Sequence, residues 1–248
     1  VTTSNDAITL TQSNALTGAV QLSSGSAASS LTTSGVLNIS TTTANGGLTL
    51  STDGAITDSG VITSSGTVSM TTTNDAITLD QANALTGPVQ FNSGSAATSL
   101  TNFPSALNIS TTTANGGLTL STDGAITDSG VITSSGAVSM TTTNDAITLD
   151  QVNLFTGSVA FAIGSAATSI TNSVGAYAVA ASTANGGITL SNNGAITNTG
   201  VITSSGAVSV TTSNDAITLT QSNALTGAVQ LSSGSAASSL TTSGVLNI

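Results

Sequence analysis

The stretch GLTLSTDGAITDSGVITSSGAVSM, residues 117–140, alternates short apolar runs with turns that contain glycine. In Leu118-Thr119-Leu120 and Val138-Ser139-Met140 the flanking residues share one face and the central residue takes the other, which is the pattern of a β-strand. The Asp-Gly and Ser-Gly pairs between the runs are typical of turns. Helical spacing is absent, and so are the helix-favouring residues Glu, Lys and Arg. The stretch therefore predicts many short strands joined by turns.

The pattern repeats along the whole chain. Residues 1–39 recur letter for letter as residues 210–248, an offset of 209 residues. Within that distance a shorter unit recurs every 70 residues, with one step of 69, at landmarks such as Asn-Asp at 5–6, 74–75, 144–145 and 214–215. The missing residue falls where residues 32–36 replace residues 101–106, which indicates a shortened turn. We expect residues 1–248 to form one open-ended segment of a longer tandem array.

Many short strands suit a sandwich, a propeller or a solenoid, and the spacing within a repeat favours the solenoid. When successive segments of about twenty residues are aligned, apolar residues fall on apolar residues and turn residues on turn residues. This is the pattern of a parallel β-helix, whose rungs lie about 4.8 Å apart. One apolar column reads Leu118/Leu120, Val138/Met140, Val159/Phe161, Ile188/Leu190 and Val208/Val210. This predicts an all-β parallel β-solenoid with about three rungs per 70-residue repeat. The third rung of each repeat has a surplus of about eight residues, from which we expect a protruding ridge at 41–46, 111–116 and 182–186.

The composition excludes several classes of function. The net charge is −10, and the chain has no Lys, Arg, His or Cys. Nucleic acids and anionic membranes are bound mainly through clustered Lys and Arg, and no apolar run approaches the 18 or so residues of a membrane span, so we expect neither nucleic-acid binding nor membrane insertion. Catalysis needs a base, an activated nucleophile or an open metal site. We therefore expect a non-enzymatic protein without catalytic, cofactor-binding or metal-binding residues.

The aspartates form pairs five residues apart that bracket an Ala-Ile-Thr strand. In sister repeats Asn193 and Asn198 replace one pair, and Thr11 and Thr220 replace Asp80. This exchange favours turn-forming side chains that bond nearby backbone. Calcium bridging between stacked carboxylates is the alternative, although the nonapeptide of calcium-binding β-rolls is missing. The pairs are Asp53/Asp58, Asp75/Asp80, Asp123/Asp128 and Asp145/Asp150.

Serine and threonine are expected to cover the outer surface, where they solvate the strands. Strands such as Ile-Thr-Leu are expected to expose one threonine each, which argues against ice binding. The sequences Asn38-Ile39-Ser40 and Asn108-Ile109-Ser110 match the glycosylation acceptor pattern but lie inside predicted strands. Pro88 marks a strand start and Pro104 a turn, and neither indicates a cis bond.

Residues 117–140, together with AITLDQANALTGPVQF at 76–91, resemble the strand repeats of filamentous-haemagglutinin-like bacterial surface proteins. This resemblance extends over essentially the whole chain. It implies a right-handed parallel β-helix within a very large secreted or surface-displayed adhesin. It transfers no catalytic or binding residue, because such repeats form the shaft of the adhesin.

The favoured hypothesis is a structural extracellular or cell-surface fibre, or adhesin shaft, built of stacked rungs. Its expected partners are copies of itself or adjacent repeats joined end to end, and other cells or surface glycans. Two alternatives stay open. One is a carbohydrate- or surface-binding module that uses the ridge around Asn45 and Asn115 or the hydroxyl-rich faces, and the other is a solenoid stabilised by calcium.

Overall fold

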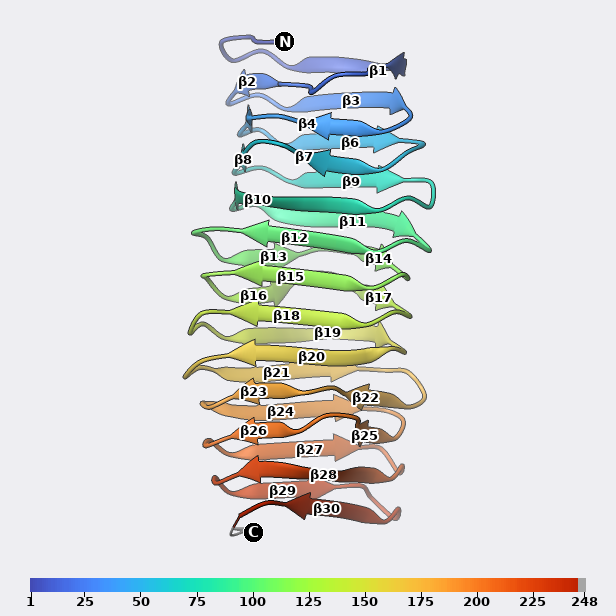
Figure 1. The fold of residues 1–248 in the computed structure, drawn as a ribbon, viewed down its shortest axis with the longest axis vertical. Coiled ribbons are helices and arrows are strands. Elements are labelled where there is room, and N and C mark those ends of the chain that lie inside the picture. Colours follow the sequence, from blue (N-terminus) through green and yellow to red (C-terminus); the bar gives the residue numbers. More distant parts are fainter. Residues whose placement is uncertain (245–248) are drawn as a thin grey trace.

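The computed structural model describes residues 1–244 and shows a rod whose two walls are parallel β-sheets (Figure 1). Ile8 pairs with Ser29, Ser29 with Leu48 and Leu48 with Val68, so one turn of the coil takes 19–21 residues. Twelve turns follow one another along the first sheet. The parallel β-solenoid fold is thereby confirmed, whereas its right-handed sense stays a prediction. Residues 245–248, which end the segment and the second 39-residue copy, lie outside the described residues.

Fourteen strands form the first sheet and sixteen form the second. The strands of the first sheet are β1 (Ile8–Ala15), β3 (Ser29–Ser34), β6 (Leu48–Thr52), β9 (Val68–Thr72), β11 (Pro88–Gly94), β13 (Leu107–Ile109), β14 (Thr112–Ala114), β16 (Ile126–Asp128), β17 (Ile132–Ser134), β19 (Ile147–Phe155), β21 (Ala167–Asn172), β24 (Gly187–Asn192), β27 (Val208–Thr212) and β29 (Val229–Ser232). Those of the second are β2 (Ser23–Gly25), β4 (Leu37–Ile39), β5 (Thr42–Ala44), β7 (Ile56–Asp58), β8 (Ile62–Ser64), β10 (Ile77–Leu85), β12 (Thr98–Asn102), β15 (Leu118–Thr122), β18 (Val138–Thr142), β20 (Ser158–Ile163), β22 (Tyr177–Val179), β23 (Ser182–Ala184), β25 (Ile196–Asn198), β26 (Ile202–Ser204), β28 (Ile217–Leu225) and β30 (Ser238–Thr242).

Each 70-residue repeat makes three and a half turns, compared with the three or so expected from the sequence. The chain crosses from one sheet to the other seven times between β10 and its sequence equivalent β19. Equivalent strands therefore alternate between the sheets, with β1 and β19 in the first and β10 and β28 in the second. The identical copies of the 39-residue segment accordingly begin on opposite faces of the rod.

The half turn corrects the expected apolar columns. Val138 pairs with Leu118 and with Val159, as expected, but Val159 then pairs with Val179. Ile188 and Val208 pair with each other in the opposite sheet. The expected column thus crosses between the sheets after Val159, because equivalent strands of successive repeats do not share a wall.

The expected ridge is also wrong. Its residues form the short strands β5, β14 and β23, which lie within the walls of the rod. Thr42 and Thr112 point inward and are each only 1% exposed. The surplus of about eight residues is nearly half of a twenty-residue turn, so it is taken up as an extra crossing and does not protrude.

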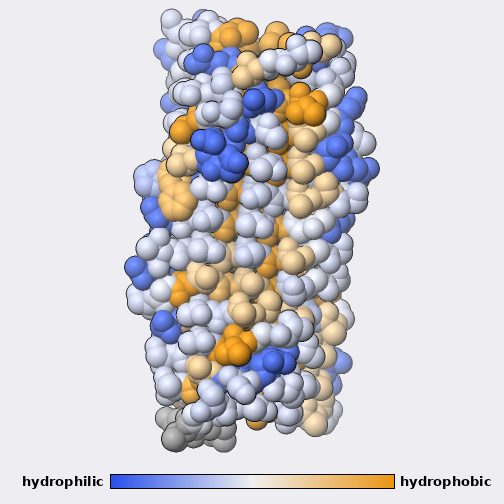
Figure 2. Space-filling view, in the orientation of Figure 1, coloured by the Kyte–Doolittle hydropathy of each residue, from blue (hydrophilic) through white to orange (hydrophobic). Residues whose placement is uncertain are grey.

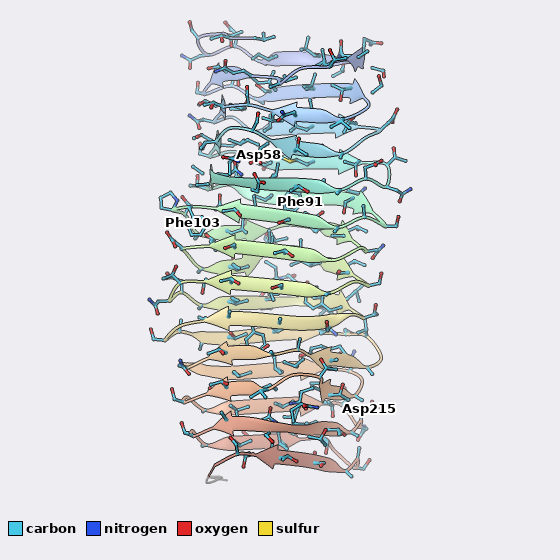
Figure 3. The ribbon with its side chains drawn as sticks, in the orientation of Figure 1. Asp58, Phe91, Phe103 and Asp215 are labelled. Carbon is cyan, nitrogen blue, oxygen red and sulfur yellow. The ribbon has the colours of Figure 1, made fainter. Side chains whose placement is uncertain are left out.

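A continuous apolar core runs between the two sheets. It consists mainly of Leu, Ile and Val, and the rings of Phe155, Phe161 and Tyr177 are also fully buried. The same holds for the ring of Phe91 (Figure 3). Burial of these rows drives the folding of the coil, at about 25 cal/mol per Å² of apolar surface removed from water. The Tyr177 hydroxyl lies in this core without a hydrogen-bond partner.

The two prolines occupy the expected places. Pro88 is the first residue of β11, and Pro104 follows β12 in a turn. The Phe103–Pro104 peptide bond is cis, which the sequence did not indicate.

Candidate functional site

A buried carboxylate sits where one turn of the coil meets the next. Asp58 ends β7 and is 8% exposed (Figure 3). One turn later the register of β10 shifts between Leu79 and Asn83, so the intervening residues leave the ladder. The backbone N–H groups of Asp80 and Gln81 donate to Asp58 Oδ1 at 2.8 and 3.4 Å, and Asn83 Nδ2 donates to Asp58 Oδ2 at 2.7 Å. The carboxylate thus accepts hydrogen bonds that the bulge would otherwise leave unmade.

Asn83 connects three turns and is fully buried. Its Oδ1 accepts the backbone N–H of Ile62 at 2.7 Å. Its Nδ2 donates to Asp58 and also to the carbonyls of Gln81 at 2.9 Å and Thr101 at 3.3 Å. Because each of these groups would be costly to bury unpaired, the asparagine holds the turns in register.

The arrangement recurs in every repeat, on alternating sheets. Asn153 Nδ2 donates to Asp128 Oδ2 at 2.6 Å, and Asn153 Oδ1 accepts the N–H of Ile132 at 2.8 Å. In the third repeat Asn198 takes the place of the aspartate and donates through Nδ2 to Asn223 Oδ1 at 2.8 Å. An uncharged amide can therefore replace the carboxylate at this position and still bond the buried asparagine. This exchange indicates that the side chain has a structural role.

The electrostatics of the site follow from its burial. Loss of hydration raises the pKa of the Asp58 carboxyl above its ordinary value, against the lowering effect of the hydrogen bonds from Asn83 and the backbone of Asp80 and Gln81. Burial raises the pKa of Asp128 in the same way. Ionisation of these two carboxyls at neutral pH therefore lowers the stability of the folded state relative to the unfolded chain.

This pKa shift predicts a stability that falls as pH rises. A group with a raised folded-state pKa contributes its full stabilisation below the unfolded-state pKa of about 4, and loses it as pH rises through the folded-state value. We expect the unfolding temperature to decrease between pH 4 and pH 7, and the double variant Asp58→Asn/Asp128→Asn to flatten that slope. Circular-dichroism melts between pH 4 and pH 7 measure the unfolding temperature and therefore its slope with pH. The exposed pair Asp53→Asn/Asp123→Asn is the control, and an unchanged slope in the first variant would contradict the assignment.

The predicted aspartate pairs do not share one arrangement: two of them flank or end a short strand, whereas Asp80 and Asp150 lie within the long strands β10 and β19, with Asp75 and Asp145 before them. Asp53 and Asp123 are exposed before β7 and β16, whereas Asp58 and Asp128 are buried at the strand ends. The interpretation of Asp58 and Asp128 as local turn-formers is wrong, since they bind backbone one turn away. Within residues 1–244 no three acidic, His or Cys side chains come close enough together to hold a metal ion.

Sequence reasoning missed the buried asparagines. Asn83 and Leu85 alternate in the same phase as Ile77 and Leu79 once the bulge is skipped, so the strand pattern places an amide inside the coil. The sequence did contain a signal for these asparagines, because a Gln-x-Asn triplet recurs in every repeat while its middle residue changes, as at Ala82 and Val152. The triplets end at Asn14, Asn83, Asn153 and Asn223.

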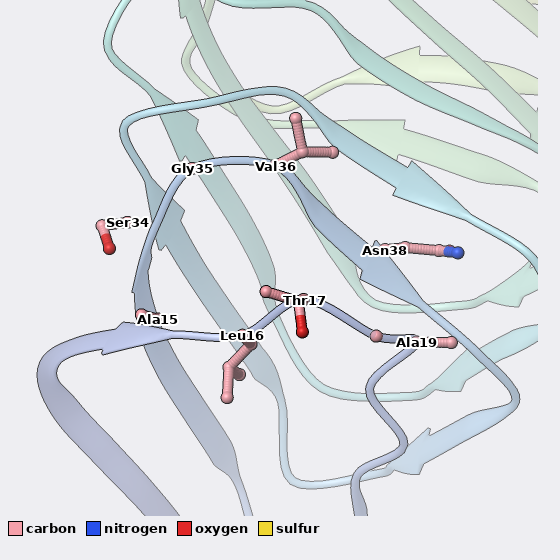
Figure 4. Close-up of a pocket in the computed structure, with 9 residues that line it drawn as sticks. Ala15, Leu16, Thr17, Ala19, Ser34, Gly35, Val36 and Asn38 are labelled. Atoms are coloured by element: carbon pink, nitrogen blue, oxygen red, sulfur yellow. The ribbon is translucent and has the colours of Figure 1, made fainter.

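One surface hollow lies at a corner near the start of the coil (Figure 4). It has a volume of about 440 Å³ between the loop Leu16–Ala19 and the turn at Gly35 and Val36. Its lining is made of small neutral residues and includes no ionisable side chain. The hollow therefore offers space but no group for acid, base or nucleophilic chemistry.

Asn38 and Asn108, which begin the two glycosylation-type sequences, lie within β4 and β13 as expected. Their Oδ1 atoms are buried without a hydrogen-bond partner. Among residues 1–244 no helix is long and apolar enough to cross a membrane.

These features define a repetitive parallel β-solenoid whose polar side chains mainly hold successive turns together. Three successive segments, residues 25–92, 95–162 and 165–232, match the family described as repeats of unknown function (DUF5649), and the chain belongs to that family. Each matched segment spans one repeat of three and a half turns. No curated protein and no solved structure matches the chain.

Proposed function

We propose that the chain is the non-catalytic shaft of an extracellular or surface-displayed fibre or adhesin of the filamentous-haemagglutinin-like kind. The observation that carries the proposal is the continuity of the ladders, since parallel strand pairs join successive turns from β1 to β29 without a break. Hydrogen bonds that run along the axis and a core shared by all turns suit a rod-like shaft, because each turn is held by its neighbours.

The side chains support a structural role over a chemical one. The buried Asp58, Asn83 and their equivalents spend their hydrogen-bonding capacity on neighbouring turns. Loss of the ridge counts against the form of the sugar-binding alternative that used it, because the residues beside Asn45 and Asn115 belong to the walls, and leaves the hydroxyl-rich faces as the other surface for that alternative. With no Lys or Arg in the chain, trypsin-type proteases find no cleavage site, which suits a long life outside cells.

Two measurements test this proposal. Small-angle X-ray scattering of the purified chain should give a rod about 58 Å long, from twelve rungs at about 4.8 Å. Antibodies raised against the chain should label the intact cells that produce it, before any permeabilisation. Labelling that appears only after permeabilisation would rule out display on the surface.

A further inference from the structure

The two faces of the rod carry two kinds of surface that alternate. One is the flat block, made of four successive long strands, which in the first repeat are β3, β6, β9 and β11. The other is the bulged block, made of three successive half-turns on the opposite sheet. In the first repeat these are β4 with β5, β7 with β8, and the long strand β10, which contains the bulge. In β10 residues 80–82 are all exposed at the bulge, with the carboxylate of Asp80 among them.

The flat blocks present uncharged rows along the axis. Most of these strands turn two polar side chains outward, one threonine and one serine, such as Thr49 and Ser51 of β6 or Thr71 and Ser69 of β9, in agreement with the expected single outward threonine per strand. These residues stack on one another in register from strand to strand. In the middle of the visible face in Figure 2, the second repeat shows such rows as pale columns of small side chains.

The half turn per repeat sets these blocks out of phase on the two faces. The flat block lies on the first sheet in repeats one and three and on the second sheet in repeat two, where it consists of β12, β15, β18 and β20. At every height, therefore, one face is flat and the other bulged. In Figure 1, β10 lies level with the interval between β9 and β11 of the opposite sheet.

We propose that copies of this chain pack side by side with parallel axes, the first sheet of one copy against the second sheet of the next at the same height. Each bulged block then meets a flat block. Asp80 of one copy faces the hydroxyl row that includes Ser69 of its neighbour, and Asp150 faces the row that includes Ser139. Packing between like faces would instead set carboxylate against carboxylate, in a chain with no cation to relieve them.

The faces are large enough for such an interface. Twelve rungs at about 4.8 Å and strands of about five residues at about 3.3 Å each give about 950 Å² per partner. A stable interface needs about 800 Å² per partner. Because the contact uses different faces on the two copies, it does not close into a dimer and extends into layers.

The experiment builds on the proposed shaft role and separates the two ideas. Sedimentation velocity and X-ray scattering of the purified chain, from about 1 to 500 µM in 0.15 M NaCl with EGTA, report lateral association as growth of the rod cross-section. We expect such growth in the wild type. A cross-section that stays constant over this range overturns side-by-side packing, while the rod length from the same data still tests the shaft.

Three variants test the facing pairs. Ser69→Asp/Ser139→Asp sets carboxylates against Asp80 and Asp150 and should weaken association at least tenfold. Ser69→Lys/Ser139→Lys sets ammonium groups there and should preserve or strengthen it. Ser209→Asp is the matched control, because the equivalent bulge carries Thr220 in place of an aspartate. Equal effects of the Asp and Lys pairs, with folding intact by circular dichroism, would overturn the proposed alignment.

Discussion

Replacing Gly157 by alanine is expected to destabilise the coil by roughly 4 kcal/mol, at the upper end of single substitutions. A Cβ at this position would lie 2.1 Å from the carbonyl oxygen of Gly136 on the preceding turn. Gly136 in turn leaves no room, since its own Cβ would lie 2.4 Å from the backbone of Gly116. The three glycines stack at one corner of the rod, and the hydrogen-bonded walls on either side prevent the turns from moving apart.

Gly18 is the matched control, because it follows Leu16-Thr17 as Gly157 follows Phe155-Thr156, and a methyl group added to it would have no atom within 4 Å. We expect Gly18→Ala to leave the unfolding temperature within about 2 °C of the wild type, whereas Gly157→Ala lowers it by about 10 °C. Circular-dichroism melts give both values. Equal unfolding temperatures for the two variants would show that the turns can separate at this corner.

The sequence predicts the class of fold well and the path of the chain less well. Alternation in segments such as Leu118 to Leu120 shows which side chains point inward, because a strand has period two. It does not show which of two similar walls a strand joins. Ile188 and Leu190 look like the continuation of Val159 and Phe161 letter by letter, and only the strand pairing places them in the opposite sheet.

The hydrogen-bonded site is hidden from the sequence for a related reason. The environment of Asp58 depends on a bulge that comes a full turn later at residues 80–82. Alternation from Ile56 places Asp58 on the inward face of β7, whereas Asp53 lies outside that strand, but nothing near Asp58 indicates that its partners come a full turn later. Exchange of aspartate for asparagine at position 198 correctly indicates a structural role, but it does not reveal the distant partner.

Removing the amide of Asn153 is expected to cost roughly 3–5 kcal/mol, the range found when a buried charged group loses its partner. Asn153→Ala leaves the N–H of Ile132 and the carboxylate of Asp128 without the bonds they make at 2.8 and 2.6 Å. Asn14, the equivalent in the first copy, is only partly buried, and it donates to carbonyls such as that of Thr32 at 2.9 Å. Asn14→Ala should therefore cost about 1 kcal/mol.

A second substitution separates the stranded charge from the lost packing. In Asn153→Ala/Asp128→Asn the group left at position 128 is a neutral amide, which costs less to bury unpaired than a carboxylate. We expect the double variant to recover about 1–2 kcal/mol of the loss, as measured by urea unfolding at pH 7. At pH 3 the single and double variants should converge, because the Asp128 carboxyl of the single variant then carries its proton. A double variant that is as unstable as Asn153→Ala at pH 7 would assign the loss to the cavity and the unpaired Ile132 N–H alone.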